Sequence, residues 1–157
     1  MTDHFHMEDG AGLRGGLPEY SALSQSLGFR VRRAQLAIMQ DFNDVLGGMR
    51  IKPADFSVLS LIAENSGLKQ SDVAAALSIQ RANFVAIVDG LENRGLIERR
   101  RSEVDRRVYY LHLTDAGHEF LESLLPKWRE HEDKFIGRLG GEGKRDELIA
   151  LLKSIAD

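Results

Sequence analysis

The stretch RGLIERRRSEVDRR, Arg94 to Arg107, decides the fold of this chain. It holds six arginines against three acidic residues, a formal charge of +3 in a protein whose net charge is −3. The residues that follow, Val108 to Thr114, read VYYLHLT and alternate in a β-rich pattern, whereas Arg81 to Asn93 carries apolar residues at helical spacing. This order predicts a helix, a short strand, an arginine-rich hairpin tip and a returning strand, which is the arrangement of a winged helix.

The hairpin tip suits a DNA groove, because guanidinium groups match phosphate geometry and favour the negative potential of a narrow minor groove. We expect Arg106 or Arg107 to enter the minor groove and Asp105 to orient one of them by a paired hydrogen bond. The other arginines of the stretch are expected to contact phosphate or to form salt bridges rather than to read bases; they are Arg94, Arg99, Arg100 and Arg101. A solvated charged hairpin is the alternative, but it does not explain why the arginines are clustered.

Two short helices joined by a tight turn precede the hairpin. We expect one helix over Gln70 to Leu77 and the next over about Gln80 to Arg94, which is the helix-turn-helix arrangement whose second helix enters the major groove. Arg81 and Asn83 are best placed to reach guanine and adenine edges, unless they are merely solvated helix residues. The other expected DNA contacts are phosphate binding by Gln70 and Ser71, thymine-methyl contact by Ala82 and Ala86, and either base contact or helix capping by Gln80.

Amphipathic helices are expected on both sides of this region. The first runs over about 18–46 until Gly47 and Gly48, a second begins at Pro53, and Thr114 caps a long helix that three glycines separate from a last one. In the hairpin, Tyr109, Leu111 and Leu113 are expected to face the core. The apolar stripes of the first helix and of the last two exceed what one small lobe can cover, so we expect a partner chain, as in a homodimer.

Composition limits the class of protein. At 157 residues and 43% hydrophobic content, the chain is expected to hold one globular domain over 18–157, with a winged helix over about 50–114, dimerisation helices over about 18–46 and 114–157, and a flexible tail over 1–17. No apolar run or leader pattern indicates a membrane segment or secretion, which favours the cytoplasm. The absence of cysteine excludes disulfides, thiolate metal ligands and a thiol nucleophile.

Leu68 to Phe120 resembles the MarR family of bacterial winged-helix regulators. The resemblance rests on four features: the helix entry Gln70 to Ala74, the run LENRGLIER from Leu91 to Arg99, the triplet Asp105 to Arg107, and LTDAG from Leu113 to Gly117. It implies a mainly α fold with a small antiparallel hairpin. It also implies a homodimer formed by the terminal helices, which binds a near-palindromic DNA operator and is usually released by a small ligand.

The expected effector site is less sharply defined. In this family effectors commonly lie between the long first helix and the DNA-binding lobe, which draws attention to Arg30, Arg32 and Arg33. The chain is also similar to members that respond to aromatic acids or hydroxycinnamoyl-CoA thioesters, and a CoA ester would suit arginines beside an apolar pocket. The aromatic and thioether side chains considered for that pocket are Met39, Phe42 and Trp128. The same arginines would equally serve as solvated or ion-paired residues, and the other three are more often core residues.

The residues favour other functions less strongly. His112, His118 and His131 lie near acidic residues, but no spacing of a catalytic or zinc site, phosphate loop or nucleophile elbow is present. His4 and His6 lack a third metal ligand. We therefore expect no catalytic residue, metal site or cofactor. The remaining alternatives are a metal-responsive dimeric regulator with His, Asp or Glu ligands, and an interaction protein that does not bind DNA.

Overall fold

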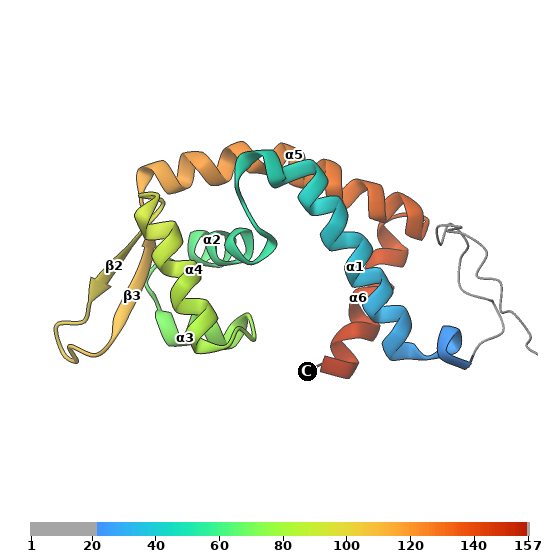
Figure 1. Ribbon diagram of the computed structural model, residues 1–157, viewed down its shortest axis with the longest axis horizontal. Coiled ribbons are helices and arrows are strands. Elements are labelled where there is room, and N and C mark those ends of the chain that lie inside the picture. Colours follow the sequence, from blue (N-terminus) through green and yellow to red (C-terminus); the bar gives the residue numbers. More distant parts are fainter. Residues whose placement is uncertain (1–21, 157) are drawn as a thin grey trace, which may run out of the picture. The chain divides into compact units, whose positions relative to one another are not determined.

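A computed structural model describes residues 22–156 of the chain (Figure 1). The tail expected over 1–17 and the expected start of the first helix at Pro18 lie outside the described residues. Within them the prediction of one helix over about 18–46 is wrong at its beginning, because 22–25 forms a separate 3-10 helix and the α-helix begins at Leu27. By their contacts the residues form two units, 1–37 and 38–157, so the boundary lies within helix α1 (Leu27–Leu46). The described part of the first unit is the short 3-10 helix η1 (Ala22–Gln25) and the beginning of α1. The single domain expected over 18–157 stays a prediction.

The second unit contains the predicted helices and the predicted hairpin. Its elements after α1 are η2 (Gly47–Met49), α2 (Pro53–Glu64), β1 (Leu68–Lys69), α3 (Gln70–Ala76), α4 (Arg81–Asn93), β2 (Ile97–Arg101), β3 (Tyr109–Leu113), α5 (Asp115–Leu139) and α6 (Glu142–Ala156). The predicted fold class, mainly α with a small antiparallel sheet and a winged helix-turn-helix, is confirmed. No helix among the described residues is long and apolar enough to cross a membrane.

The helix ends follow local chemistry. α1 ends at Leu46, before the predicted glycines, and α2 begins at Pro53, whose missing N–H is no loss in a first turn. Thr114 caps α5, because its side-chain oxygen accepts a hydrogen bond from the Gly117 N–H at 3.0 Å. α5 continues through Pro126 to Leu139, and Gly140, with φ of 97°, closes it in the left-handed region that favours glycine.

The sheet has three strands in the order β1-β3-β2, with both pairs antiparallel. β2 and β3 form the wing, in which Ile97 pairs with Leu113 at the base and Arg101 pairs with Tyr109 toward the tip (Figure 1). The prediction that Tyr109 is a core residue is wrong, because its position on the strand lies beyond the body of the lobe and its side chain is 38% exposed. Leu111 and Leu113, nearer the base, are buried as predicted.

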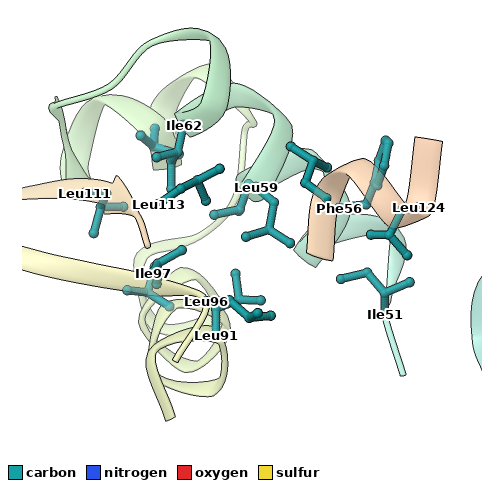
Figure 2. Close-up of a cluster of buried hydrophobic side chains, with 14 of the residues drawn as sticks. Ile51, Phe56, Leu59, Ile62, Leu91, Leu96, Ile97, Leu111, Leu113 and Leu124 are labelled. Carbon is teal, nitrogen blue, oxygen red and sulfur yellow. The ribbon is translucent and has the colours of Figure 1, made fainter. Parts of the chain in front are cut away.

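The core of the winged helix lies between α2, α4, α5 and the sheet. Figure 2 shows side chains from these elements directed toward one another, among them Leu59 of α2, Leu91 of α4, Leu111 of β3 and Leu124 of α5. Each of these four is almost completely buried. Burial of such side chains contributes about 1.5–3 kcal/mol each to folding, so this lobe holds its own core.

Gly117, in the first turn of α5, lies directly against the segment that leads into β2. A Cβ atom placed on it would lie 1.9 Å from the carbonyl oxygen of Leu96. The same segment is held by two hydrogen bonds: the Thr114 N–H donates to the Leu96 carbonyl at 3.1 Å, and the Thr114 hydroxyl donates to the Gly95 carbonyl at 2.6 Å. The wing is therefore anchored to α5 at a position that has no room for any side chain.

Helix α6 differs from the rest of this unit, because none of its residues with a described side chain is buried. Its large apolar residues are between 39% and 64% exposed; they are Leu148, Ile149, Leu151, Leu152 and Ile155. An amphipathic helix that exposes this much apolar surface is typical of a surface that another chain covers.

Candidate nucleic-acid interface

One face of α4 presents the residues that were predicted to read bases. Arg81, Ala82, Asn83 and Ala86 are all exposed, whereas Phe84, on the opposite face of the helix, is buried. Neither Arg81 nor Asn83 has a side-chain hydrogen bond or ion pair with any described residue. Their donors and acceptors are therefore free to contact a ligand. Gln80 occupies the N-cap position, but its side chain makes no capping hydrogen bond.

A groove of about 840 Å³ separates α4 from the wing. α3 contributes Gln70 and Ser71, α4 contributes Arg81, and the wing contributes Arg107 and Tyr109. Lys69, just before α3, adds a further cation at the rim. The Ser71 hydroxyl donates to the neighbouring Asp72 carboxylate at 3.1 Å. The groove thus brings together polar residues from each element that the sequence assigned to DNA binding.

The wing turn is held by hydrogen bonds within itself. The Ser102 hydroxyl accepts the N–H groups of Val104 and Asp105 at 3.3 and 3.2 Å. The Asp105 carboxylate accepts the Arg107 N–H at 2.9 Å and lies 3.5 Å from Arg107 Nε. Asp105 therefore faces Arg107 through a backbone hydrogen bond and a longer ion pair, and this geometry is not the paired side-chain hydrogen bond that was expected.

The arginines of the wing differ in how far they are engaged within the chain. Arg107 is 93% exposed, and Arg106 is exposed and has no side-chain hydrogen bond or ion pair with the described residues. Arg101 instead donates from Nε to the Arg106 carbonyl at 2.6 Å, and its guanidinium lies 5.9 Å from the centre of the Tyr109 ring. Arg101 therefore braces the wing turn, while Arg106 and Arg107 point their charge to solvent.

Two more arginines of the stretch are fixed by contacts inside the lobe. Arg94 donates to the Arg50 carbonyl at 2.8 Å and lies 4.9 Å from the centre of the Phe120 ring. Arg99, on β2, pairs with Asp89 and Glu92 of α4. Arg99 therefore forms salt bridges within the lobe. Arg94 is held by a hydrogen bond to a backbone carbonyl and by an aromatic ring.

The aromatic residues considered for an effector pocket lie in one cluster. Phe42 of α1 packs edge-on against Phe56 of α2 at 5.8 Å between ring centres, and Phe56 stacks with Trp128 of α5 at 5.7 Å. The structure thus joins Phe42 and Trp128 through Phe56, which the sequence did not single out. Met39 is partly exposed at 36%. The rings fill the space among themselves, so the effector role of this cluster stays a prediction.

A buried polar group borders this aromatic cluster. His131 of α5 lies 2.8 Å from the Asp41 carboxylate of α1 and packs edge-on against both Phe42 and Phe135. Lys134 pairs with the other oxygen of the same carboxylate. Hydrogen bonds from Lys134 and from His131 lower the pKa of Asp41 below its usual value, against the opposing effect of burial. Asp41 is therefore a buried carboxylate with two partners.

The arginines considered for a CoA ester lie in the first unit. Arg30 donates to the Ser24 carbonyl at 2.5 Å, whereas Arg32 and Arg33 are exposed and make no side-chain contact with described residues. They belong to residues 1–37, and Phe42 and Trp128 belong to residues 38–157. The arginines and the aromatic residues of the expected effector site therefore belong to different units, and the effector site stays a prediction. No group of three or more His, Asp or Glu residues in the described part of the chain could hold a metal ion.

The comparisons with known proteins agree with this geometry. Residues 51–108 match the family model described as MarR family. Over 137 residues the chain is 34% identical to the candidate transcriptional regulatory protein for the hcr operon of Thauera aromatica, an alignment that covers 87% of this chain and 82% of that protein. The chain belongs to the MarR family. It is thus a transcriptional regulator of the MarR type, and the relatives found are regulators rather than enzymes.

Two solved structures of a MarR-type repressor are also similar. The repressor CouR bound to a 23-mer DNA duplex is 40% identical to this chain, with a TM-score of 0.84, and the match covers 91% of this chain and all of that one. CouR bound to p-coumaroyl-CoA is 39% identical, with a TM-score of 0.78, and covers 90% of this chain and 96% of that one. The family resemblance and the aromatic-CoA subgroup predicted from the sequence are confirmed.

Proposed function

We propose that this MarR-family protein is a sequence-specific repressor that binds a near-palindromic operator as a homodimer. One observation carries the proposal: the exposed, unengaged side chains of Arg81 and Asn83 on α4 stand beside a wing whose Arg106 and Arg107 are also unburied. A helix in the major groove and a hairpin in the minor groove would use these two sets together. The similar repressor CouR has been solved on a DNA duplex, which supports the proposal.

The residues have different proposed roles on DNA. Arg81 and Asn83 read base edges, and Ala82 and Ala86 contact thymine methyl groups. Gln80, which makes no capping hydrogen bond, is assigned a base contact beside them. Phosphate contacts are assigned to Gln70, Ser71 and Arg101, with Arg101 also bracing the wing. Arg106 and Arg107 serve the minor groove, with Asp105 holding the backbone of Arg107 in place. In a homodimer the two recognition helices would lie about one DNA turn apart, roughly 10 base pairs or a multiple, so the operator would be an inverted repeat.

Substitution of α4 and of the wing separates these roles. Arg81→Ala should cost about 1–3 kcal/mol of operator affinity and relax base preference at one position in each half-site. The double variant Arg106→Ala, Arg107→Ala should weaken binding to many sequences and lower the salt slope by about one unit per lost phosphate contact. Mobility-shift titrations at several salt concentrations, on operator and scrambled DNA, measure both effects. Unchanged affinity in both folded, dimeric variants would place the DNA surface elsewhere.

The effector that we propose is an aromatic acid or its CoA thioester, which releases the repressor from DNA in the cytoplasm. CouR, which is similar over nearly the whole chain, has been solved with p-coumaroyl-CoA. The phosphates of CoA are assigned to Arg30, Arg32 and Arg33, whose guanidinium groups suit phosphate. The aromatic acyl group is assigned to Met39, Phe42 and Trp128.

Ligand-dependent thermal stability tests this class of effector, because a ligand that binds only the native state raises its apparent stability. Aromatic acids should be compared with their CoA thioesters, using the wild type and the single Ala variants of Arg30, Arg32 and Arg33. The variants should lose more affinity for the thioester than for the free acid. An equal loss for both ligands, or no loss for either, would remove the role of these arginines in binding phosphate.

A further inference from the structure

Arg99 of β2 is bound by two carboxylates of the recognition helix. Its Nη2 lies 2.5 Å from Asp89 Oδ1, and its Nη1 lies 2.7 Å from Glu92 Oε2. The backbone N–H of Arg99 also donates to Glu92 Oε1 at 3.3 Å. Three contacts therefore connect the first residues of the wing to α4, at the inner end of the groove between them.

The geometry of this group suits a rigid connection. Asp89 and Glu92 are three residues apart, so they stand on the same face of α4, one turn from each other. The planar guanidinium presents one terminal nitrogen to each carboxylate, Nη2 to Asp89 and Nη1 to Glu92, in a fixed relative geometry. The side chain of Arg99 is only 19% exposed, and its Nε is buried without a hydrogen-bond partner among the described residues. Arg99 is therefore occupied within the protein and is not available to bind phosphate.

The neighbouring arginine on the same strand provides a contrast. Arg100 is 62% exposed and pairs only with Glu98, which lies on the same strand. The ion pair of Arg100 therefore lies within β2 and does not connect the wing to another element. Of these two arginines, Arg99 is the one whose side chain connects β2 to α4, although the two residues look alike in the sequence.

We propose that Arg99 is a positioning residue that sets the spacing between the recognition helix and the wing, so that both reach their grooves on one DNA site. This inference rests on the proposed function, because it assumes that α4 and the wing both contact DNA. With α4 in the major groove and the wing in the adjacent minor groove, the phosphate backbone between those grooves passes over the groove lined by Arg99. A wing held in advance at this spacing avoids the entropy cost of ordering it during binding.

The charge of the group adds to its effect. Asp89 and Glu92 together carry two negative charges, and Arg99 neutralises one of them next to the expected path of the phosphate backbone. Loss of Arg99 would leave two carboxylates facing that backbone and would release the wing at the same time. Substitution of Glu92 would instead remove one of the partners of Arg99 and one of these negative charges together.

The test compares Arg99→Met with Arg100→Met, which removes the same charged group from the adjacent position. The DNA is the set of duplexes that the wild-type protein selects from a random-sequence pool. Arg99→Met should weaken binding by on the order of tenfold, the effect of about 1.4 kcal/mol. Hydroxyl-radical footprints should lose protection in the flanking minor grooves and keep it over the central contacts of α4. Arg100→Met should keep both protected regions.

Three outcomes would overturn the proposal. A salt slope lowered by about one unit in Arg99→Met, with the flanks still protected, would mean that Arg99 binds phosphate directly. Unchanged affinity and footprint would mean that the spacing does not depend on Arg99. An equal effect of Arg100→Met would mean that only the charge of the wing matters.

A second variant keeps the test valid if Arg99→Met fails to fold. Glu92→Ala removes both contacts of Glu92 and leaves Arg99 paired with Asp89, so it should reduce protection of the flanks; full protection of the flanks in a folded Glu92→Ala protein would contradict the proposal. Failure of the proposed function itself would give different experimental results. In that case wild-type protein selects no sequence from the pool, or its footprint does not depend on Arg81 and on the wing arginines.

Discussion

The winged-helix lobe and helix α6 use apolar residues in opposite ways. In the lobe, leucines such as Leu59, Leu111 and Leu124 are completely enclosed by other elements of the same chain. In α6, leucines such as Leu151 and Leu152 are 59% and 40% exposed. The two regions have similar residues, so the difference lies in what covers them. The lobe is complete as a folding unit, whereas α6 exposes a face suited to a second chain.

Because of this contrast, we expect substitutions in the lobe and in α6 to affect different properties, namely folding stability and the association of two chains. A change inside the lobe acts on the free energy of unfolding, because close-packed interiors have little room to adjust. A change on the exposed face of α6 acts on the association of two chains, and it leaves the fold of each chain largely intact. α5 connects the regions, since its first turns pack in the lobe and its last turns lead into α6.

The largest effect is expected from Gly117→Ala. The new Cβ would overlap the Leu96 carbonyl oxygen, so α5 and the base of the wing would have to separate, at a cost of about 3 kcal/mol or more. Gly137→Ala is the matched control in the same helix, because a Cβ there meets nothing within 4 Å. That change should stabilise the protein by roughly 0.5–1 kcal/mol. Urea unfolding measures both, and equal effects would remove the distinction between the two regions.

The next effect concerns association. Leu151→Asp together with Ile155→Asp places two charges on the exposed apolar face of α6, and we expect the dimer to dissociate at micromolar concentration. Substitution at the centre of an interface costs about 2 kcal/mol or more for its main residues. Lys153→Asp introduces the same side chain elsewhere on the helix and should leave the dimer intact. Sedimentation equilibrium measures the assembly, and a double variant that stays dimeric would place the interface elsewhere.

The smallest effect is expected where α1 meets α5, at Asp41. Because its pKa is lowered in the fold, the ionised carboxylate contributes stability above its ordinary pKa of 3.8, and this contribution is lost as the pH falls through the lower folded value. Asp41→Asn should therefore lower stability at neutral pH and flatten the pH dependence under acid conditions. Asp133→Asn, at an exposed position on α5, is the control. Parallel acid-unfolding curves for wild type and Asp41→Asn would contradict the assignment.

The order of helices and the wing could be predicted from the sequence because both depend on local patterns. The apolar spacing of α4, the proline at the start of α2 and the alternation in β3 each involve neighbours along the chain. Strand β1 was missed because its two residues, Leu68 and Lys69, are too few to show an alternating pattern. It exists only because β3 provides a partner for it.

The roles of individual side chains were harder to predict, because they depend on contacts between distant elements. The sequence indicated that the arginines of the wing bind DNA or form salt bridges, but not which of them do so. Arg99 and Arg100 are consecutive on β2, so their side chains point to opposite faces of the sheet. Only the packing of β2 against α4 shows that Asp89 and Glu92 lie on the face of Arg99. In the sequence, His131 is only one of three histidines near acidic residues. Its burial follows from the packing of α1 against α5, where Asp41 pairs with it.

The order of strands in the small sheet has a consequence for how the lobe assembles. β2 and β3 are joined by a short turn, so their pairing closes a small loop at low entropic cost. β1 pairs with the same strand only after the chain has passed through α3, α4 and β2, which makes that closure slower and costlier. The wing is thus expected to form before β1 joins the sheet. Pulse-labelled hydrogen exchange should find Tyr110, which is paired with β2, protected earlier than Gly67, whose N–H donates to the Leu111 carbonyl. The wing, which is proposed to contact DNA, would thus also provide the strand, β3, to which β1 is added.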